Sequence, residues 1–550
     1  MDVRLAAATA AIFLAAVAPA AGQTPGSTGG TPPTSSADSL SLSSKEAIEI
    51  AERDTKVREA EAGHGALSPV AQAEPPDTWQ VGFKRGSDEV VQVLVDDPSG
   101  TVRESWTGYQ VEWQMARGYE GSFGGVLNAP WVWLPLCAIF VIDLLDLRRL
   151  RRIVHLDLLV LLGFGASHYF FNRGEIGLSV PLVYPVLVYL LARMLWIGFR
   201  GPGEGLRPSA PALWLAAGAV FLLAFRLVVN VADSGVIDVG YAGVIGADLI
   251  GHGEAVWGEG AFPEENSFGD TYGPANYFAY LPFELGLPWS GAWDELAAGH
   301  VAAIAFDLAA VVALFFLGRR LRAGAAGTKL GAALAFAWAA YPYAAYTLAA
   351  NANDSLVAAL IAWSLVAFSS PIGRGVLLAT AAAVKFVPLA LVPLYAAGHR
   401  SLPSPLRPGS WGRPRRAVVV FAAALVLTSA VLLLHPAIDP GLATFYERTI
   451  ASQLDRSSPF SVWGQADLGP LHLAVEVFAL GLAVAVAFVP RQRSFAQIAA
   501  LAAAVLIAVQ LIADHWFYLY IVWFFPPLIA AISLDGGGGD EMGNRGSALP

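Results

Sequence analysis

The sequence predicts an all-α polytopic membrane protein of about eleven spans, with a small α+β domain at its N-terminus. Three observations lead to this prediction. Hydrophobic residues make up 55% of the 550 residues and charged residues only 14%, whereas a soluble domain carries about 25% charged residues. The apolar residues form long blocks without charge, such as 211–225 and 417–434. The basic residues collect in alternate loops between these blocks, as the positive-inside rule requires.

The first residues have the pattern of a secretory signal, which we place at 1–22. Arg4 precedes an apolar run over 5–17, and Ala18-Pro19-Ala20 offers small residues for cleavage. An uncleaved anchor is the alternative, and both place residue 23 onward outside the cytoplasm. Residues 23–43 are rich in Gly, Ser, Thr and Pro, which predicts a flexible linker.

Residues 44–128 are expected to form an extracytoplasmic module. An amphipathic helix is predicted over 44–62. Alternating segments predict strands at 79–83, 90–95 and 101–105. A helix followed by a short antiparallel sheet resembles the PepSY module over residues 44–108, and a generic small α+β domain is the alternative. The single cysteine, Cys137, allows no intrachain disulfide.

The membrane spans follow this module, and the C-terminal tail, 535–550, is expected in the cytoplasm. The inner loops carry Arg148 to Arg152, Arg200 and Arg207, Arg319 to Arg322, and Arg491 and Arg493. The expected spans lie near 131–147, 153–171, 180–199, 211–230, 297–318, 329–349, 353–370, 417–434, 471–489, 495–513 and 516–533.

One apolar segment, 372–397, breaks the alternation because both of its flanks are basic. A single crossing would put five arginines outside. We therefore predict a hairpin of two half-length helices that turns near Lys385-Phe386-Val387-Pro388, where the proline disfavours helix in the preceding residue. The alternative is an ordinary span with a basic outer loop.

Two long outer loops, 231–296 and 435–470, are rich in acidic and aromatic residues. A transporter usually places its polar chemistry at the membrane midplane, so this distribution favours an enzyme at the outer surface. Asp233 and Asp238 follow the fourth span, and each is a candidate general base or a helix cap. Asp307, inside the fifth span, is expected to be functional or to pair with Arg226.

Several motifs in a fixed order resemble a known family. They are Asp238-x-x-Tyr241, Tyr272-Gly273-Pro274, Asn351-Ala352-Asn353-Asp354, the segment 383–389 and the segment 514–518. Together they are similar to the GT-C superfamily of integral membrane glycosyltransferases, and most similar to glycosyltransferase family 87, the polyprenyl-phosphate-mannose-dependent type. The resemblance covers about residues 205–533 and gives a GT-C-like domain at 205–534, preceded by additional membrane helices at 129–204. Tyr-Gly-Pro stands where the family pattern has Tyr-Pro-Pro.

The resemblance implies an inverting transfer of a sugar, mannose in that family, from a polyprenyl-phosphate donor to a membrane lipid or cell-envelope glycan. Asp238 is the expected base, with Asp233 as the second candidate. A departing phosphate needs cations, and the candidates are Arg448, Arg456, His515 and Lys385. The expected sugar and acceptor contacts are Tyr241, Asp270, Tyr272, Asn276 and Asp354. No cofactor and no nucleic-acid partner is expected, and a divalent metal remains open.

Two other functions fit the same chain. A lipid or polysaccharide transporter would depend on Asp307 and on midplane residues. A non-catalytic membrane scaffold, whose N-terminal module binds a partner, would tolerate loss of both Asp307 and Asp238. A transferase depends on Asp238 and the outer loops.

Overall fold

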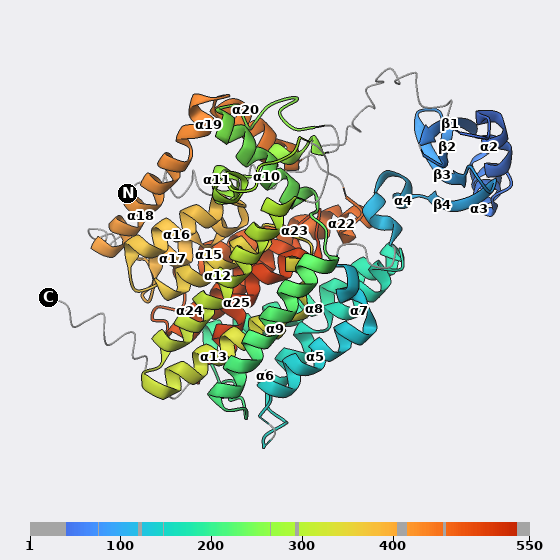
Figure 1. Cartoon of the computed structure of the whole chain (residues 1–550). Helices are drawn as coiled ribbons and strands as arrows, with labels where there is room; N and C mark the ends of the chain where they lie inside the picture. The colour runs from blue at the N-terminus through green and yellow to red at the C-terminus, as the bar shows by residue number, and fades with distance from the viewer. Residues whose placement is uncertain are drawn as a thin grey trace. The chain divides into compact units, whose positions relative to one another are not determined.

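The computed structural model describes residues 40–74, 76–118, 124–146, 148–263, 266–291, 296–403, 415–454 and 458–535. The expected signal at 1–22, most of the linker and the tail beyond Asp535 lie outside them. The chain divides into two compact units, a smaller one from 22–120 with 169–178 and a larger one from the remaining residues. The architecture is mostly helical, with one small antiparallel sheet near the N-terminus (Figure 1).

The smaller unit is a four-stranded antiparallel sheet with strand order β1-β2-β3-β4, covered on one face by two helices. Alternate residues Val81, Phe83, Val91, Val93 and Val95 point into the core against these helices. The elements are α2 (Ser44–Ala51), α3 (Thr55–His64), β1 (Ser68–Glu74), β2 (Thr78–Arg85), β3 (Asp88–Asp96), β4 (Thr101–Thr107), α4 (Tyr109–Glu112) and η2 (Gln114–Arg117).

Two features of this unit differ from the prediction. The single helix expected over 44–62 is two helices, because Asp54 leaves the helical conformation and its side chain caps the N–H of Lys56 at 2.8 Å. Strand β1 was not predicted, because its sequence, Ser-Pro-Val-Ala-Gln-Ala-Glu, lacks large alternating apolar residues. It lies at the sheet edge, where such a polar strand is tolerated.

The end of the expected linker is tied to the sheet. The Asp97 carboxylate accepts the backbone N–H groups of Ser41 and Leu42, at 2.7 and 2.8 Å. Leu40 and Leu42 pack against the core of the unit. Residues 40–42, at the end of the expected linker, therefore pack as part of the smaller unit.

The chain after the smaller unit is helical almost throughout. Its longer helices are α5 (Pro130–Leu144), α6 (Ile153–Leu161), α7 (Phe164–Phe171), α8 (Ile176–Arg200), α9 (Ala212–Asp233), α10 (Asp238–His252), α11 (Pro274–Glu284), α12 (Ala297–Leu321), α13 (Gly324–Ala340), α14 (Pro342–Ala349), α15 (Asp354–Val366), α16 (Pro371–Ala382), α18 (Arg416–Leu432), α23 (Gly469–Ala485), α24 (Phe495–Leu511) and α25 (Ile521–Ile532). Short elements join them: η3 (Gly125–Asn128), η5 (Gly269–Thr271), η6 (Val387–Leu391), α17 (Val392–Ala397), α19 (Leu434–Ile438), α20 (Leu442–Tyr446), η8 (Glu447–Ala451), α21 (Ser452–Leu454), α22 (Val462–Gln465) and η9 (Tyr518–Tyr520).

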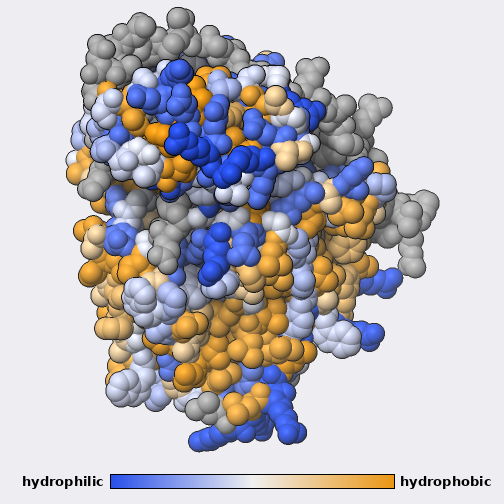
Figure 2. Space-filling view, turned by 90° about the vertical axis from the view of Figure 1, so that its right-hand side faces the viewer, coloured by the Kyte–Doolittle hydropathy of each residue, from blue (hydrophilic) through white to orange (hydrophobic). Residues whose placement is uncertain are grey.

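Among the described residues, four stretches are long and apolar enough to cross a membrane, by length and composition: Ile153–Phe171, Ile176–Arg200, Ala212–Asp233 and Ala297–Leu321. Other expected spans are shorter or interrupted, as at Pro342, which separates α13 from α14. Large apolar side chains such as Trp214 and Val231 are more than 70% exposed. Hydrophobic side chains also cover a broad lower area of the face in Figure 2. Such a surface indicates a membrane protein.

The basic loops of the larger unit gather at one end of the helices. Arg149 pairs with Glu204, and Arg322 pairs with Asp535, at 3.0 and 3.1 Å. Further contacts belong to the same end. Arg320 donates to the Ser369 hydroxyl, and Arg493 donates to the Gly398 carbonyl. The Arg374 guanidinium lies close to the Cα of Gly398. Helix α12 leads away from this end over 25 residues, or about 37 Å.

Segment 371–397 leaves the basic end and returns to it. Helix α16 begins beside Ser370 and ends at Ala382, and a 3₁₀ turn, η6, starts at Val387. Helix α17 then descends to Gly398, where an added Cβ would lie 3.0 Å from the guanidinium of Arg374. The chain thus reverses near Lys385, between two short helices that lie side by side in Figure 1.

The other end of the helices carries α10, α11, α19 and α20 (Figure 1). Between the two ends, Arg226 donates to Asp307 at 2.7 Å, and the Trp338 indole donates to the same carboxylate oxygen at 2.7 Å. Both charged side chains are buried. Of the two expectations for Asp307, the structure therefore shows the pairing with Arg226.

Candidate functional site

The site is organised by the tetrapeptide Asn351-Ala352-Asn353-Asp354, which joins α14 to α15. Asn351 has a left-handed backbone, with φ of 50°, a conformation that asparagine tolerates better than most residues. Its side-chain amide donates to Ser234 and to the Gly235 carbonyl, both at 3.0 Å. Asn351 thereby fixes the loop that leads into α10 and Asp238.

The next polar residues of the tetrapeptide bind two other segments. The Asn353 amide donates to Asn276 Oδ1 on α11 at 2.8 Å. Asp354 Oδ1 accepts from Lys385 Nζ at 2.6 Å and from the Trp523 indole at 2.8 Å. Asp354 also lies in the first turn of α15, where the helix dipole favours a negative charge. Four segments distant in sequence thus meet at one short turn.

Lys385 lies at the tip of the α16–α17 reversal, inside an aromatic cage. Its ammonium is 5.6, 5.5 and 5.3 Å from the ring centres of Tyr272, Tyr520 and Trp523. The Lys385 side chain is 12% exposed and its partner Asp354 is fully buried. An ammonium has three donors, and Asp354 accepts one, so two remain for a ligand.

Tyr272 is held in this cage by its backbone. Its N–H donates to the Tyr277 hydroxyl at 3.3 Å, and its carbonyl accepts from the Trp257 indole at 3.1 Å. The following Gly273 packs on the chain just before Lys385, where an added Cβ would lie 2.2 Å from the Ala383 carbonyl oxygen. The glycine of Tyr-Gly-Pro is therefore required by this close approach.

Asp238 is the first residue of α10 and is exposed. Its backbone carbonyl accepts from the Asn266 amide at 3.0 Å. Burial raises the pKa of the Tyr272 hydroxyl well above its ordinary value, and the charges of Asp238 and Asp354 raise it further. Both carboxylates therefore act on the same phenol. Tyr241, one turn beyond Asp238, is buried in the packing of α10 against α11.

Asp233 has a different environment. Its carboxylate accepts the backbone N–H of Val126 at 2.5 Å, in the short η3 turn that precedes α5. It thus ties that turn to the end of α9. Five of the expected site residues, Asp238, Tyr272, Asn276, Asp354 and Lys385, are brought together, whereas Asp233 has this separate partner.

Arg448 and Asp270 bind one another. Arg448 Nε donates to Asp270 Oδ2 at 2.5 Å, and Nη2 donates to Oδ1 at 3.1 Å. The hydrogen bonds that Asp270 accepts from Arg448 raise the pKa of the Arg448 guanidinium. This bidentate pair joins the two long loops, and the Arg448 side chain retains 29% exposure.

The remaining expected cations are His515 and Arg456. His515 Nδ1 lies 2.9 Å from the Ser458 hydroxyl, and its ring packs edge-on against Phe460. Arg456 lies outside the described residues. Within the described ranges, no group of three or more His, Cys, Asp or Glu side chains is placed to hold a metal.

Sequence reasoning missed three residues of the site. Tyr520 and Trp523 stack at 4.3 Å and form two walls of the Lys385 cage, and Tyr280 lies one turn after Asn276 on α11. Tyr520 and Trp523 directly follow the 514–518 motif at a spacing of three, so the signal was present. It was hidden among the aromatic residues of an apolar span.

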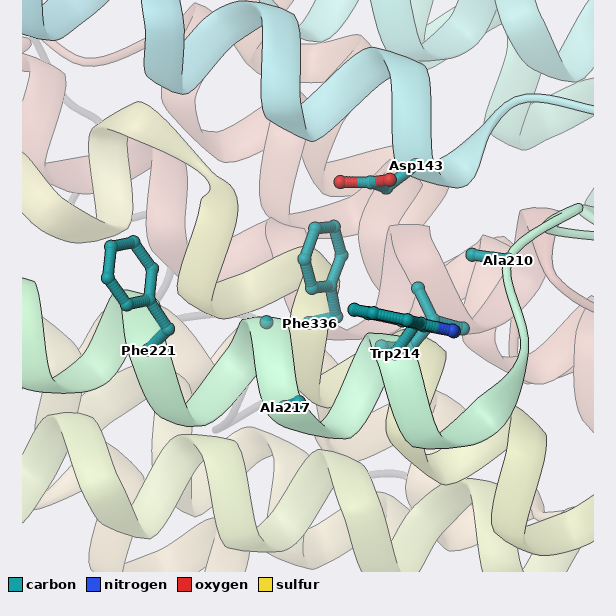
Figure 3. Close-up of a pocket in the computed structure, with 8 residues that line it drawn as sticks. Asp143, Ala210, Trp214, Ala217, Phe221 and Phe336 are labelled. Carbon is teal, nitrogen blue, oxygen red and sulfur yellow. The ribbon is translucent and has the colours of Figure 1, made fainter.

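A cavity of about 350 Å³ lies elsewhere, between α5, α9 and α13. Figure 3 shows Asp143 on α5 above Phe336 and Trp214. Apart from Asp143, the residues that line the cavity are apolar, and none of them is a cation. The remaining lining residues are Ala210, Leu215, Ala217, Gly218 and Phe221. This lining does not suit a phosphate.

No family model matches the chain, and no curated protein is significantly similar to it.

Proposed function

We propose that the protein is a membrane glycosyltransferase that moves a sugar from a polyprenyl-phosphate donor to an acceptor outside the cytoplasm. The observation that carries the proposal is the position of the exposed Asp238 carboxylate near the caged ammonium of Lys385. Ile237, next to Asp238, donates its N–H to the Ala350 carbonyl at 3.3 Å, directly before the tetrapeptide whose Asp354 binds Lys385. The carboxylate is suited to accept a proton and the ammonium to bind a phosphate.

In the proposed reaction, Asp238 accepts the proton of the acceptor hydroxyl as its oxygen attacks the anomeric carbon. The bond from that carbon to the phosphate oxygen breaks, and the polyprenyl phosphate leaves with the electron pair. Lys385 stabilises the charge on the leaving phosphate through the donors that Asp354 does not use. Attack opposite the leaving group inverts the anomeric centre, and no cofactor takes part.

The other expected site residues have weaker or indirect roles in this proposal. Arg448 retains exposed surface and serves as a second cation, although Asp270 already neutralises part of its charge. His515 is a third. Asp270 and Tyr241 act indirectly, because they hold the loop and the helix that carry Tyr272 and Asp238.

The proposed topology follows from the two ends of the larger unit. The basic end lies in the cytoplasm, as the positive-inside rule favours, and the site end lies outside with the N-terminal module. The helices beyond the four long ones complete about eleven spans, with 371–397 as a hairpin that does not cross. In this proposal the protein lies in the cell membrane, and the acceptor is a membrane lipid or cell-envelope glycan.

A transporter fits the structure less well. Its expected midplane residue, Asp307, is enclosed with Arg226 and Trp338 in a buried network. A charge held in this way contributes to structure, whereas a transport site needs a path for its ligand.

The test is a pair of carboxamide variants assayed with radiolabelled polyprenyl-phosphate mannose and a cell-envelope lipid extract. Asp238→Asn should fold, bind the donor and lose transfer by about 10²-fold or more, the usual contribution of a general base. Asp233→Asn is the control and should lose much less, since its carboxylate binds Val126. A reversed order makes Asp233 the base. If the parent is active and neither variant changes transfer, the mechanism fails and Asp270 and Asp354 are examined next.

A further inference from the structure

Five buried polar atoms around Asp354 have no hydrogen-bond partner among the residues that the structure describes. They are Asn276 Nδ2, Tyr280 OH, Asn353 Oδ1, Asp354 Oδ2 and Ser355 Oγ. All five side chains are at most 1% exposed. They belong to two adjacent elements, α11 and the start of α15, which the Asn353–Asn276 hydrogen bond joins.

Buried polar atoms without a hydrogen-bond partner lower the stability of a fold, and a cluster of them lowers it several times over. An unsatisfied buried donor or acceptor destabilises a fold by about 1–3 kcal/mol, and folded proteins contain few of them. Nearby residues show that this packing can satisfy its polar groups. Ser364, on the same helix as Ser355, lies 2.9 Å from the Tyr395 hydroxyl and also donates to the Ile361 carbonyl.

The chemistry of the five atoms specifies the kind of ligand. Lys385 already compensates the charge of Asp354, so the group carries no net charge. Asn276, Tyr280 and Ser355 can donate, whereas Asn353 and Asp354 accept through the named oxygens. A phosphate would need donors only, and a metal ion would need acceptors without an adjacent ammonium. Hydroxyl groups both donate and accept, so a polyhydroxylated ligand matches the set.

We propose that Asn276, Tyr280, Asn353, Asp354 and Ser355 form the subsite that binds the hydroxyl groups of the donor sugar. The inference rests on the proposed function, because it places the sugar beside the phosphate held by Lys385. The five atoms are closed to solvent in the substrate-free structure. The sugar therefore replaces the Asn353–Asn276 hydrogen bond and separates α11 from the start of α15 as it enters.

The experiment compares the affinities of the protein for a glycosylated polyprenyl phosphate and for bare polyprenyl phosphate. Tyr280→Phe and Ser355→Ala should leave the affinity for the bare carrier unchanged and weaken binding of the glycosylated carrier by about 3- to 10-fold, the worth of one hydrogen bond. Tyr395→Phe and Ser364→Ala are matched controls from the satisfied pair, and should leave the ratio of the two affinities unchanged.

Unfolding in detergent supplies a second readout. Tyr280→Phe and Ser355→Ala remove atoms without partners, so both should unfold at the same denaturant concentration as the parent or a higher one. The controls each break a buried hydrogen bond and should unfold at a lower concentration. A subsite variant that loses stability like its control shows that the removed hydroxyl had a partner, which overturns the premise.

The outcomes separate the two proposals. If the parent binds both carriers and the affinity ratio stays constant in Tyr280→Phe and Ser355→Ala, the subsite is refuted and the proposed function stands. If the parent binds neither carrier, the proposed function fails and the subsite fails with it.

Discussion

The ion pair between Lys385 and Asp354 allows a sharp test of the site's energetics. We consider three variants: Lys385→Met, Asp354→Asn and the double variant. Removing one partner of a buried pair costs about 3–5 kcal/mol, because it leaves an uncompensated charge. Lys385→Met leaves the Asp354 carboxylate fully buried, with the Trp523 indole still donating to it. We therefore expect this variant to lose about 3–5 kcal/mol of unfolding free energy.

The opposite single variant should be milder. Asp354→Asn leaves the Lys385 ammonium facing three aromatic rings at 5.3 to 5.6 Å and with 12% exposure. Each ring contributes about 0.5–1 kcal/mol to a cation over its face, so the three rings together offset about 1.5–3 kcal/mol of the loss. The expected cost of Asp354→Asn is therefore about 0–3.5 kcal/mol.

The double variant removes both charges and should cost no more than Lys385→Met alone, because no buried charge is stranded. Denaturant unfolding of the purified protein in detergent measures all three. Two results would refute the reasoning. Additive losses would show that the charges are not coupled, and a larger loss for Asp354→Asn than for Lys385→Met would show that the aromatic cage does not stabilise the ammonium.

Three further predictions concern packing, topology and pH. Gly273→Ala should weaken donor binding and lower stability, because its Cβ would lie 2.2 Å from the Ala383 carbonyl oxygen. The control, Gly481→Ala, has open space around its Cβ and should be neutral or stabilising by up to about 1 kcal/mol. Equal changes in melting temperature for the two variants would contradict this prediction. In a Cys137→Ser background, an impermeant thiol reagent applied outside should label Glu259→Cys but not Pro408→Cys, and labelling of the latter would exclude the hairpin topology. Partial burial acts to raise the pKa of Asp535, but the Gly205 N–H and Arg207 outweigh it and hold that pKa below its ordinary value. Asp535→Asn should therefore be less stable than the parent at pH 7, with the difference vanishing as the pH falls below about 4; a constant difference down to pH 3 would rule out the ionised carboxylate as its source.

Much of the helical architecture followed from the sequence because hydrophobic blocks and loop charges are local signals. The reversal near Lys385 was expected from the two basic flanks of 372–397, and the backbone turns there. The break between α2 and α3 was not expected, because a run of good helix formers concealed the cap at Asp54. Strand β1 was missed for a related reason, since an edge strand needs little hydrophobic alternation.

The site was harder to predict because its function depends on pairing across the fold. Asp238, Asp354 and Lys385 were chosen for their motifs, but no spacing shows that Lys385 faces Asp354, 31 residues away. Likewise, Arg448 was expected at the donor phosphate, and only the folded chain places it against Asp270. For the same reason, the sequence cannot show which buried groups have no hydrogen-bond partner among the described residues, such as the Tyr280 hydroxyl.

The shortness of α16 has a consequence for the membrane itself. Its 12 residues rise about 18 Å, whereas the hydrocarbon core of a bilayer is about 30 Å thick. In the topology proposed above, with the basic end at the cytoplasmic boundary, this short rise places Lys385 below the outer headgroup plane. In the proposed reaction, the donor phosphate therefore has to move below the other headgroups to reach the ammonium. Hydrophobic mismatch then sets the length of that descent, and we expect turnover in vesicles to fall as lipid acyl chains lengthen.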